Sequence, residues 1–204
     1  IQDIQTERKR VAVERALASP FHKGRIPADI DLDRLDDPAE WNRIPILDKE
    51  MLRAIPPQDF LNKFCNAPRR DIAELWRSGG STGTPLFYPR TFKDMEYGRL
   101  SFARVYDCAG ATAEDTVHDS FPLGIHPVGT LMARAAQSLG IGVNWAGAGN
   151  STPSQAQINL LKMLEPSMWM GMSSYGLHLA NMAEAEGIDL ANGSVKTLIC
   201  SAEQ

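Results

Sequence analysis

From residue 77 onward, short apolar stretches alternate with longer amphipathic ones, and this alternation constrains the fold more than any other feature. Strands are expected at residues 86–88, 117–121, 142–146, 167–172 and 197–200. Helices are expected at residues 92–109, 128–139, 153–164 and 174–186. Crossovers of this length join parallel strands. The sequence therefore predicts an α/β fold, a mostly parallel sheet flanked by helices.

Residues that begin or end helices support this assignment. Thr152, Pro153 and Gln155 have the spacing of a capping box that would start the helix at residues 153–164. Glycines stand where three helices are expected to end, at Gly110, Gly140 and Gly187.

Residues 1–76 lack the alternation and predict a helical, loop-rich N-terminal extension, followed by an α/β part at 77–204. A first helix is expected at residues 7–18, before Pro20. Asp48 is expected to cap a short helix that stops at Pro56 and Pro57.

The composition excludes several classes of function. The net charge is −4, and no basic stripe is present, which argues against nucleic-acid binding. No apolar run approaches the roughly 20 residues of a membrane helix, and the charged first residues lack the apolar core of a signal peptide. The three cysteines are far apart and fit buried, reduced thiols. We therefore expect a cytoplasmic protein with no membrane or nucleic-acid partner.

One loop before the first expected strand is rich in glycine and hydroxyl residues. It reads Arg77-Ser78-Gly79-Gly80-Ser81-Thr82-Gly83-Thr84-Pro85. Glycines let backbone N–H groups surround an anion, and hydroxyls donate further hydrogen bonds to phosphate oxygens. A flexible linker has the same composition, and the loop lacks the Gly-Lys ending of a P-loop. Taken alone, the loop leaves both interpretations open.

With its flanks, this loop resembles the phosphate-binding signature of adenylate-forming enzymes, specifically the phenylacetate–CoA ligase family. That signature ends Thr-Gly-Lys-Pro, and here it ends Thr82-Gly83-Thr84-Pro85. Four further stretches resemble the family in consistent order from about residue 40. They are a Leu-Pro-x-x-x-Lys-x-x-Leu-Arg-like segment at 44–53, a strand–loop–helix at 121–140, a Pro-Ser-Tyr-like helix start at Ser173-Ser174-Tyr175 with a Gly-Ile-Asp ending at 187–189, and a Gly-Ala-Glu-Pro-like motif at Ser201-Ala202-Glu203-Gln204.

The resemblance implies an AMP-forming acyl-CoA ligase. Such enzymes join a carboxylic acid, here expected to be aromatic, to ATP with Mg2+, and coenzyme A then attacks the acyl-adenylate to give a thioester. On this resemblance the phosphates would be bound by Ser78, Gly79, Gly80, Ser81, Thr82, Gly83 and Thr84. The adenine would lie against Ser201, Ala202 and Glu203, and the acyl pocket would be bordered by Phe121, His126 and Tyr175. No catalytic residue and no metal ligand is assigned.

Two residues depart from the family pattern. Thr84 replaces the loop lysine and removes a positive charge from beside the phosphates. His126 stands where an aromatic residue is usual, which suits a more polar acid, although it could equally cap the following helix. Tyr175 also has an alternative, as a packed core tyrosine.

The family's chains run to more than twice this length, so we expect the N-terminal part of a ligase, either a fragment or one half of a split enzyme. Its partners would be the remaining half or another copy of the chain. Two alternatives stay open. One is an acyl-protein synthetase that passes the acyl group to a protein thiol, and the other is an inactive nucleotide-binding or scaffold subunit.

Overall fold

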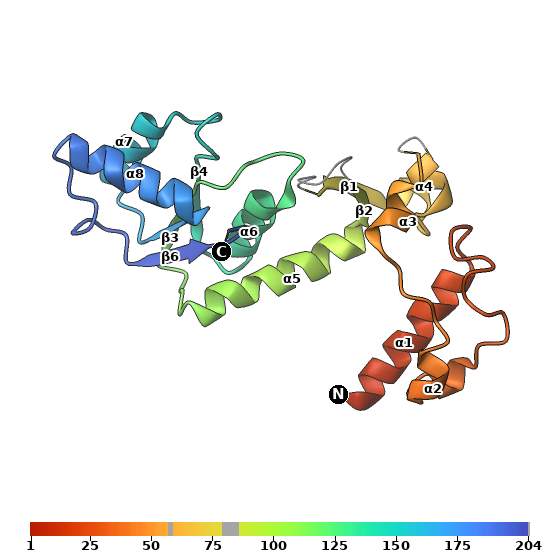
Figure 1. The fold of residues 1–204 in the computed structure, drawn as a ribbon. Helices are drawn as coiled ribbons and strands as arrows, with labels where there is room; N and C mark the ends of the chain where they lie inside the picture. Colours follow the sequence, from red (N-terminus) through yellow and green to blue (C-terminus); the bar gives the residue numbers. More distant parts are fainter. Residues whose placement is uncertain (57–58, 79–85, 204) are drawn as a thin grey trace. The chain divides into compact units, whose positions relative to one another are not determined.

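The computed structural model describes residues 1–56, 59–78 and 86–203 (Figure 1). The chain divides into two compact units, Ile1–Phe92 and Lys93–Gln204. The domain boundary expected near residue 77 stays a prediction.

The first unit is built from helices and one small sheet. Its elements are α1 (Gln2–Leu17), η1 (Leu32–Arg34), α2 (Pro38–Trp41), α3 (Lys49–Arg53), α4 (Phe60–Lys63), η3 (Arg69–Asp71), β1 (Ile72–Arg77) and β2 (Phe87–Thr91). Asp48 caps α3 as predicted, because its carboxylate accepts the Met51 N–H at 2.9 Å. One small core packs Phe21, Leu52 and Leu86 together.

Strand β1 is a correction to the expected helical and loop-rich extension. Ile72, Leu75 and Trp76 have helical spacing, yet they form a strand. The strand exists because it pairs antiparallel with β2, with Trp76 opposite Tyr88. The strand expected at 86–88 is therefore part of this two-stranded sheet and not of the parallel one.

The second unit carries the predicted α/β alternation. Its elements are α5 (Phe92–Cys108), which starts at the last residue of the first unit, β3 (Thr116–Asp119), α6 (Pro127–Ser138), β4 (Gly142–Trp145), α7 (Ser154–Leu164), β5 (Met168–Gly171), α8 (Ser173–Ala185) and β6 (Thr197–Cys200). The strands run in the order β4-β3-β5-β6, and all three pairings are parallel. The predicted fold class is confirmed.

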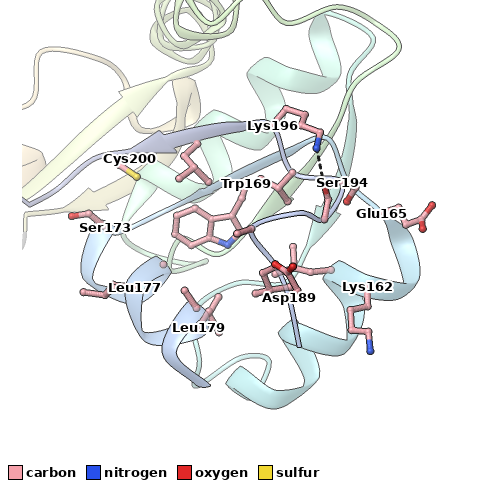
Figure 2. A pocket seen from close by; sticks show the side chains of 18 residues that line it. Lys162, Glu165, Trp169, Ser173, Leu177, Leu179, Asp189, Ser194, Lys196 and Cys200 are labelled. Atoms are coloured by element: carbon pink, nitrogen blue, oxygen red, sulfur yellow. Dashed lines mark hydrogen bonds between the residues drawn. The ribbon is translucent and has the colours of Figure 1, made fainter. Parts of the chain in front are cut away.

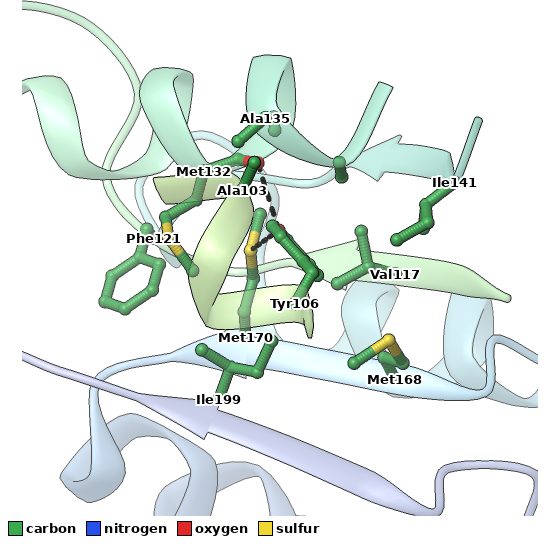
Figure 3. Packing of buried hydrophobic residues seen from close by; sticks show 12 residues of the cluster. Ala103, Tyr106, Val117, Phe121, Met132, Ala135, Ile141, Met168, Met170 and Ile199 are labelled. Carbon is green, nitrogen blue, oxygen red and sulfur yellow. Dashed lines mark hydrogen bonds between the residues drawn. The ribbon is translucent and has the colours of Figure 1, made fainter. Parts of the chain in front are cut away.

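Helices cover both faces of this sheet. Val117, Met168 and Met170 alternate with His118 and Trp169 along β3 and β5, so the two sets point to opposite faces. The first set packs with α5 and α6 in the larger core, where Tyr106 donates a hydrogen bond from its hydroxyl to the Met132 carbonyl at 3.0 Å (Figure 3). Trp169 packs on the other face with α7 and α8.

The strand order reverses direction at the carboxyl ends of β3 and β5. The chain leaves β3 through α6 toward β4 on one side, and it leaves β5 through α8 toward β6 on the other. Such a reversal opens a cleft outside the carboxyl ends of the strands, where open α/β sheets bind ligands. The residues after β3 stay close to β5, since the Ser120 N–H donates to the Met170 carbonyl at 2.8 Å.

The predicted helix ends are confirmed and one predicted helix start is wrong. Gly110, Gly140 and Gly187 have φ of 71°, 81° and 70°, the left-handed backbone of a helix C-terminus. At α7 the N-cap is Pro153, without a side-chain cap. The Thr152 hydroxyl instead donates to the Ala146 carbonyl at 2.6 Å, because a tertiary partner is available to it.

The cysteines and the helix lengths bear on two further expectations. Cys65, Cys108 and Cys200 are free, as expected, but Cys65 is half-buried and the other two are exposed, so the expected burial is wrong. Across the described ranges, no helix combines the length and the apolar character needed to span a membrane.

Candidate active site

The predicted adenine-side and acyl-pocket residues follow the carboxyl ends of the parallel strands. Phe121 lies two residues after β3, Tyr175 lies in the first turn of α8 after β5, and Ser201–Glu203 follow β6. Because β3, β5 and β6 are parallel, these segments lie at the same edge of the sheet. This is the edge at which the strand order reverses between β3 and β5.

Glu203 links the predicted adenine-side segment to the start of α8. Its carboxylate accepts hydrogen bonds from the Ser174 N–H at 2.8 Å, the Ser174 hydroxyl at 2.6 Å and the Ser173 hydroxyl at 3.0 Å. These bonds, first the one from the Ser174 hydroxyl, hold the pKa of Glu203 below its usual value. A carboxylate here also faces the positive end of the helix dipole. Ala202 turns the chain with φ of 74°, in the left-handed region.

Tyr175 belongs to a buried polar network centred on Gln157. Gln157 lies on α7 and is 0% exposed. Its side-chain nitrogen is 3.0 Å from the Tyr175 hydroxyl oxygen, which is also 3.1 Å from the Ser154 hydroxyl oxygen. Tyr175 is half-buried, and its ring stacks on His178 with centroids 6.0 Å apart. The hydroxyl is thus fixed while part of the side chain stays accessible.

The same network reaches the strands. The Gln157 side-chain oxygen accepts hydrogen bonds from the Ser120 hydroxyl at 2.6 Å and from His118 Nε2 at 3.2 Å. The Trp169 indole N–H in turn donates to the Ser120 hydroxyl at 2.9 Å. Sequence reasoning missed Gln157, because a glutamine on an amphipathic helix is typical of its solvent face. The signals available in the sequence were two polar residues beside apolar ones, Ser120 directly after β3 and His118 within β3, which need a buried hydrogen-bond partner.

The other two predicted acyl-pocket residues are placed differently. Phe121 is fully buried in the larger core, and its N–H donates to Asp119 Oδ1 at 2.9 Å. His126 is half-buried at the N-cap of α6 but makes no side-chain cap. Neither residue takes part in the Gln157 network.

Asp119 is a buried carboxyl group that sequence reasoning did not single out. It ends β3, is 0% exposed, and its Oδ2 has no hydrogen-bond partner among the described residues. Burial raises its pKa to about 7, a shift that the hydrogen bond from Phe121 N–H only partly offsets. Tyr106 is buried on the same side of the sheet, and burial raises its pKa as well.

The predicted phosphate loop is described only at its first residue. Ser78 follows β1, where its N–H donates to the Leu86 carbonyl at 2.9 Å and its hydroxyl accepts the Leu86 N–H at 3.0 Å. Gly79, Gly80, Ser81, Thr82, Gly83 and Thr84 lie outside the described residues.

A groove of about 690 Å³ runs beside β6 and α8 (Figure 2). Its walls include Trp169, Leu177 and Leu198, and the two leucines are 63% and 67% exposed. Charged side chains of Lys162, Glu165, Asp189 and Lys196 also line it. Phe121, His126 and Tyr175 are not among the lining residues. The groove is mainly an uncovered apolar surface, although Ser173, a hydrogen-bond partner of Glu203, also lines it.

Among the described residues, no three His, Cys, Asp or Glu side chains gather where they could hold a metal ion. None of these residues is assigned to Mg2+.

Comparisons with known proteins agree with the predicted resemblance to the phenylacetate–CoA ligase family. No protein-family model matches the chain. The chain is 28% identical over 205 residues to phenylacetate–coenzyme A ligase of Aromatoleum evansii, covering 100% of this chain and 45% of that protein. It is 30% identical over 159 residues to the Pseudomonas putida enzyme of the same name, covering 78% of this chain and 34% of that protein. The chain thus spans less than half the length of the curated relatives that it matches.

A solved structure shares the fold. An open conformation of 2-hydroxyisobutyryl-CoA ligase in complex with 2-HIB-AMP and CoA matches 98% of this chain and 46% of that one, with a TM-score of 0.84 and 21% identity. At that identity the match concerns the fold alone. The resemblance of this chain to the N-terminal part of the phenylacetate–CoA ligases, expected from its motifs, is therefore confirmed, and its fold is that of adenylate-forming CoA ligases.

Proposed function

We propose that this chain is part of an enzyme that activates a carboxylic acid with ATP to an acyl-adenylate and then passes the acyl group to coenzyme A. One observation carries the proposal. The match to phenylacetate–coenzyme A ligase covers the whole of this chain, and it includes three motifs of the resemblance that lie at one edge of the sheet. We take the acid to be aromatic because the curated relatives are named for phenylacetate.

The proposed roles follow from where the chemistry needs each group. Adenylation requires the acid's carboxylate to be held in line with the α-phosphorus, and the charge on the phosphates to be balanced. We assign Tyr175 and the residues after β3, Phe121 and His126, to the acid, and Ser201–Glu203 to the adenine. Glu203 suits this role because its bonds to α8 fix the segment beside Tyr175.

For the phosphates we propose the loop at residues 78–84. Ser78 supports this role, since its two contacts with Leu86 join the ends of the loop. Mg2+ and coenzyme A are proposed on the resemblance alone, and so is a cytoplasmic location. The Mg2+ ion would balance phosphate charge during adenylation.

We further propose that the groove beside β6 is covered by the rest of the ligase. The curated relatives are more than twice as long as the matched part. Leu177 and Leu198 are large apolar side chains that a stable soluble protein normally covers when they form a continuous surface.

An ATP–pyrophosphate exchange assay tests the function. The protein, isolated as it occurs in its source, is incubated with labelled pyrophosphate, ATP, Mg2+ and one acid at a time from a panel that includes phenylacetate, benzoate and short aliphatic acids. We expect label to enter ATP only when a suitable acid is present, and coenzyme A to yield a thioester of that acid. Absence of exchange with every acid, from protein that binds ATP, would refute the proposed adenylation.

A further inference from the structure

We infer that Gln157 is a positioning residue for the acid substrate: its side-chain amide holds the Tyr175 hydroxyl and the segment after β4 in fixed places at the edge where the acid binds. The inference rests on the proposed function, because Tyr175 is assigned to the acyl pocket there. Gln157 itself is fully buried, so it acts through its neighbours.

One amide joins three connections of the sheet. On its oxygen side it is bonded to Ser120, which directly follows β3. On its nitrogen side it lies 2.9 Å from the Gly147 carbonyl oxygen and 3.0 Å from the Thr152 carbonyl oxygen, both in the segment after β4. The same nitrogen lies 3.0 Å from the hydroxyl oxygen of Tyr175, which follows β5. Only the side-chain amides of Asn and Gln offer an acceptor and two donors in one plane, and here the two protons of the Gln157 nitrogen are shared among three acceptors.

The hydrogen-bond directions in this network are consistent with one another. The Asn144 side-chain amide donates to His118 Nδ1 at 2.8 Å, so His118 carries its proton on Nε2. Nε2 donates this proton to the Gln157 side-chain oxygen, with 3.2 Å between the nitrogen and the oxygen. Burial lowers the pKa of His118, which keeps the ring neutral as this arrangement requires. The amide orientation of Gln157 is thereby fixed from the side of the sheet.

The segment after β4 lies directly against the Tyr175 hydroxyl. A methyl group built on Gly149 would come within 3.1 Å of the Tyr175 hydroxyl oxygen and 3.4 Å of the Ser154 hydroxyl oxygen. Since the Gly147 and Thr152 carbonyls are both held by Gln157, this amide sets how closely the segment approaches Tyr175. A shift of either one would change the shape of the proposed acid pocket.

A purely structural role would not require an amide. Ile158 and Leu161 on the same helix already provide the apolar packing of α7. A methionine at residue 157 would fill a similar volume, whereas a buried amide is tolerated only when its hydrogen bonds are satisfied. The cost of burying this group therefore points to a requirement for fixed geometry.

Steady-state kinetics of Gln157→Met test the inference on the protein as it occurs in its source. We expect the KM for the acid to rise about tenfold, the effect of losing roughly one orienting hydrogen bond, while the KM for ATP stays within about twofold. Tyr175→Phe should raise the same KM, and the double variant should lie within about twofold of Gln157→Met, because Gln157→Met already releases the hydroxyl that Tyr175→Phe removes. Gln155→Met is the matched control: the side chain of this neighbour bonds to Glu186 across an exposed contact and to no member of the Gln157 network among the described residues, so both KM values should be unchanged.

The outcomes separate the inference from the proposed function. Wild-type protein that binds ATP but supports no acid-dependent exchange overturns both. If the wild-type protein is active but Gln157→Met raises the KM for the acid and the KM for ATP equally, the positioning role alone is overturned. It is also overturned if the rise in the acid KM of the double variant equals the product of the rises in the two single variants. If Gln157→Met does not fold, Tyr175→Phe and Ser154→Ala decide the matter, since each removes one hydroxyl from the network and should raise the acid KM selectively.

Discussion

Asp119→Asn should remove a pH-dependent loss of stability from this chain. The carboxyl group is fully buried, and its pKa is raised from 3.8 to about 7 because burial disfavours the charged form. The folded chain therefore holds the proton more tightly than the unfolded chain, and stability falls as pH rises from about 4 to about 7. Above that range the loss is complete and constant.

The magnitude follows from the two pKa values. The difference between 3.8 and about 7 is about three units, and each unit corresponds to about 1.4 kcal/mol, so the full loss is about 4 kcal/mol. Between pH 5 and pH 8 the loss is about 3 kcal/mol. Asparagine keeps the acceptor that Phe121 N–H uses and carries no charge. Its amino group gains no partner, which costs about 1–3 kcal/mol at every pH and leaves the slope unaffected.

The assay is urea denaturation of the wild type and the variant at several pH values from 5 to 8. The free energy of unfolding of Asp119→Asn should rise by about 3 kcal/mol relative to the wild type across this range. Asp115→Asn is the matched control, because hydrogen bonds, first that from the Thr112 N–H, lower the pKa of this half-buried aspartate from 3.8, so that it stays charged from pH 5 to 8. Its curve should run parallel to the wild type. Parallel curves for Asp119→Asn as well would show that Asp119 has an ordinary pKa and refute the reasoning.

Three further predictions concern other parts of the chain. Because burial lowers the pKa of His118 from 6.5, the unfolded chain binds the proton first, and the contribution of His118 to stability should fall as pH drops below about 6.5; NMR titration of the ring, combined with denaturation of Asp119→Asn at pH 7 and 5.5, would detect this without the opposing effect of Asp119. Ser81→Ala with Thr82→Ala should weaken ATP binding in calorimetry, and unchanged affinity would remove the phosphate-loop assignment. Gly171→Ala should destabilise the fold by about 1–3 kcal/mol in thermal denaturation, because the new methyl would lie 2.5 Å from the buried Trp169 ring; an unchanged midpoint would mean that the ring can move.

The elements of the second unit could be predicted because their signals are local. Alternating apolar stretches gave β3 to β6 and their helices within a few residues, and the glycines at 110, 140 and 187 marked helix ends through backbone conformation alone. Strand β1 could not be found in this way, since its apolar spacing is helical and pairing with β2 decides its structure. Pairing with a neighbouring strand outweighs the local preference of these residues for a helix.

The candidate site was predictable only where a motif carried it. Tyr175 and Glu203 were named through their resemblance to family motifs, and their roles stay predictions. Gln157 and Asp119 have no motif and stand out only by their burial, which the sequence does not state. Thr152 illustrates the same limit, because its hydroxyl could cap α7 but instead bonds to Ala146. When a polar side chain has several possible hydrogen-bond partners, the folded structure decides which of them it bonds to.

Glu203 explains why two of the separate motifs occur together. Ser173 and Ser174 begin one motif, Glu203 belongs to another, and 29 residues separate Ser174 from Glu203. In the structure their side chains form a single set of hydrogen bonds in which the carboxylate accepts both hydroxyls and the Ser174 N–H. A change in either motif would release the other, since the exposed carboxylate would lose its partners and the first turn of α8 its capping acceptor. The predicted adenine-side segment and the helix that carries Tyr175 are thus one structural unit, and the parallel sheet brings the two motifs together, although they are far apart along the chain.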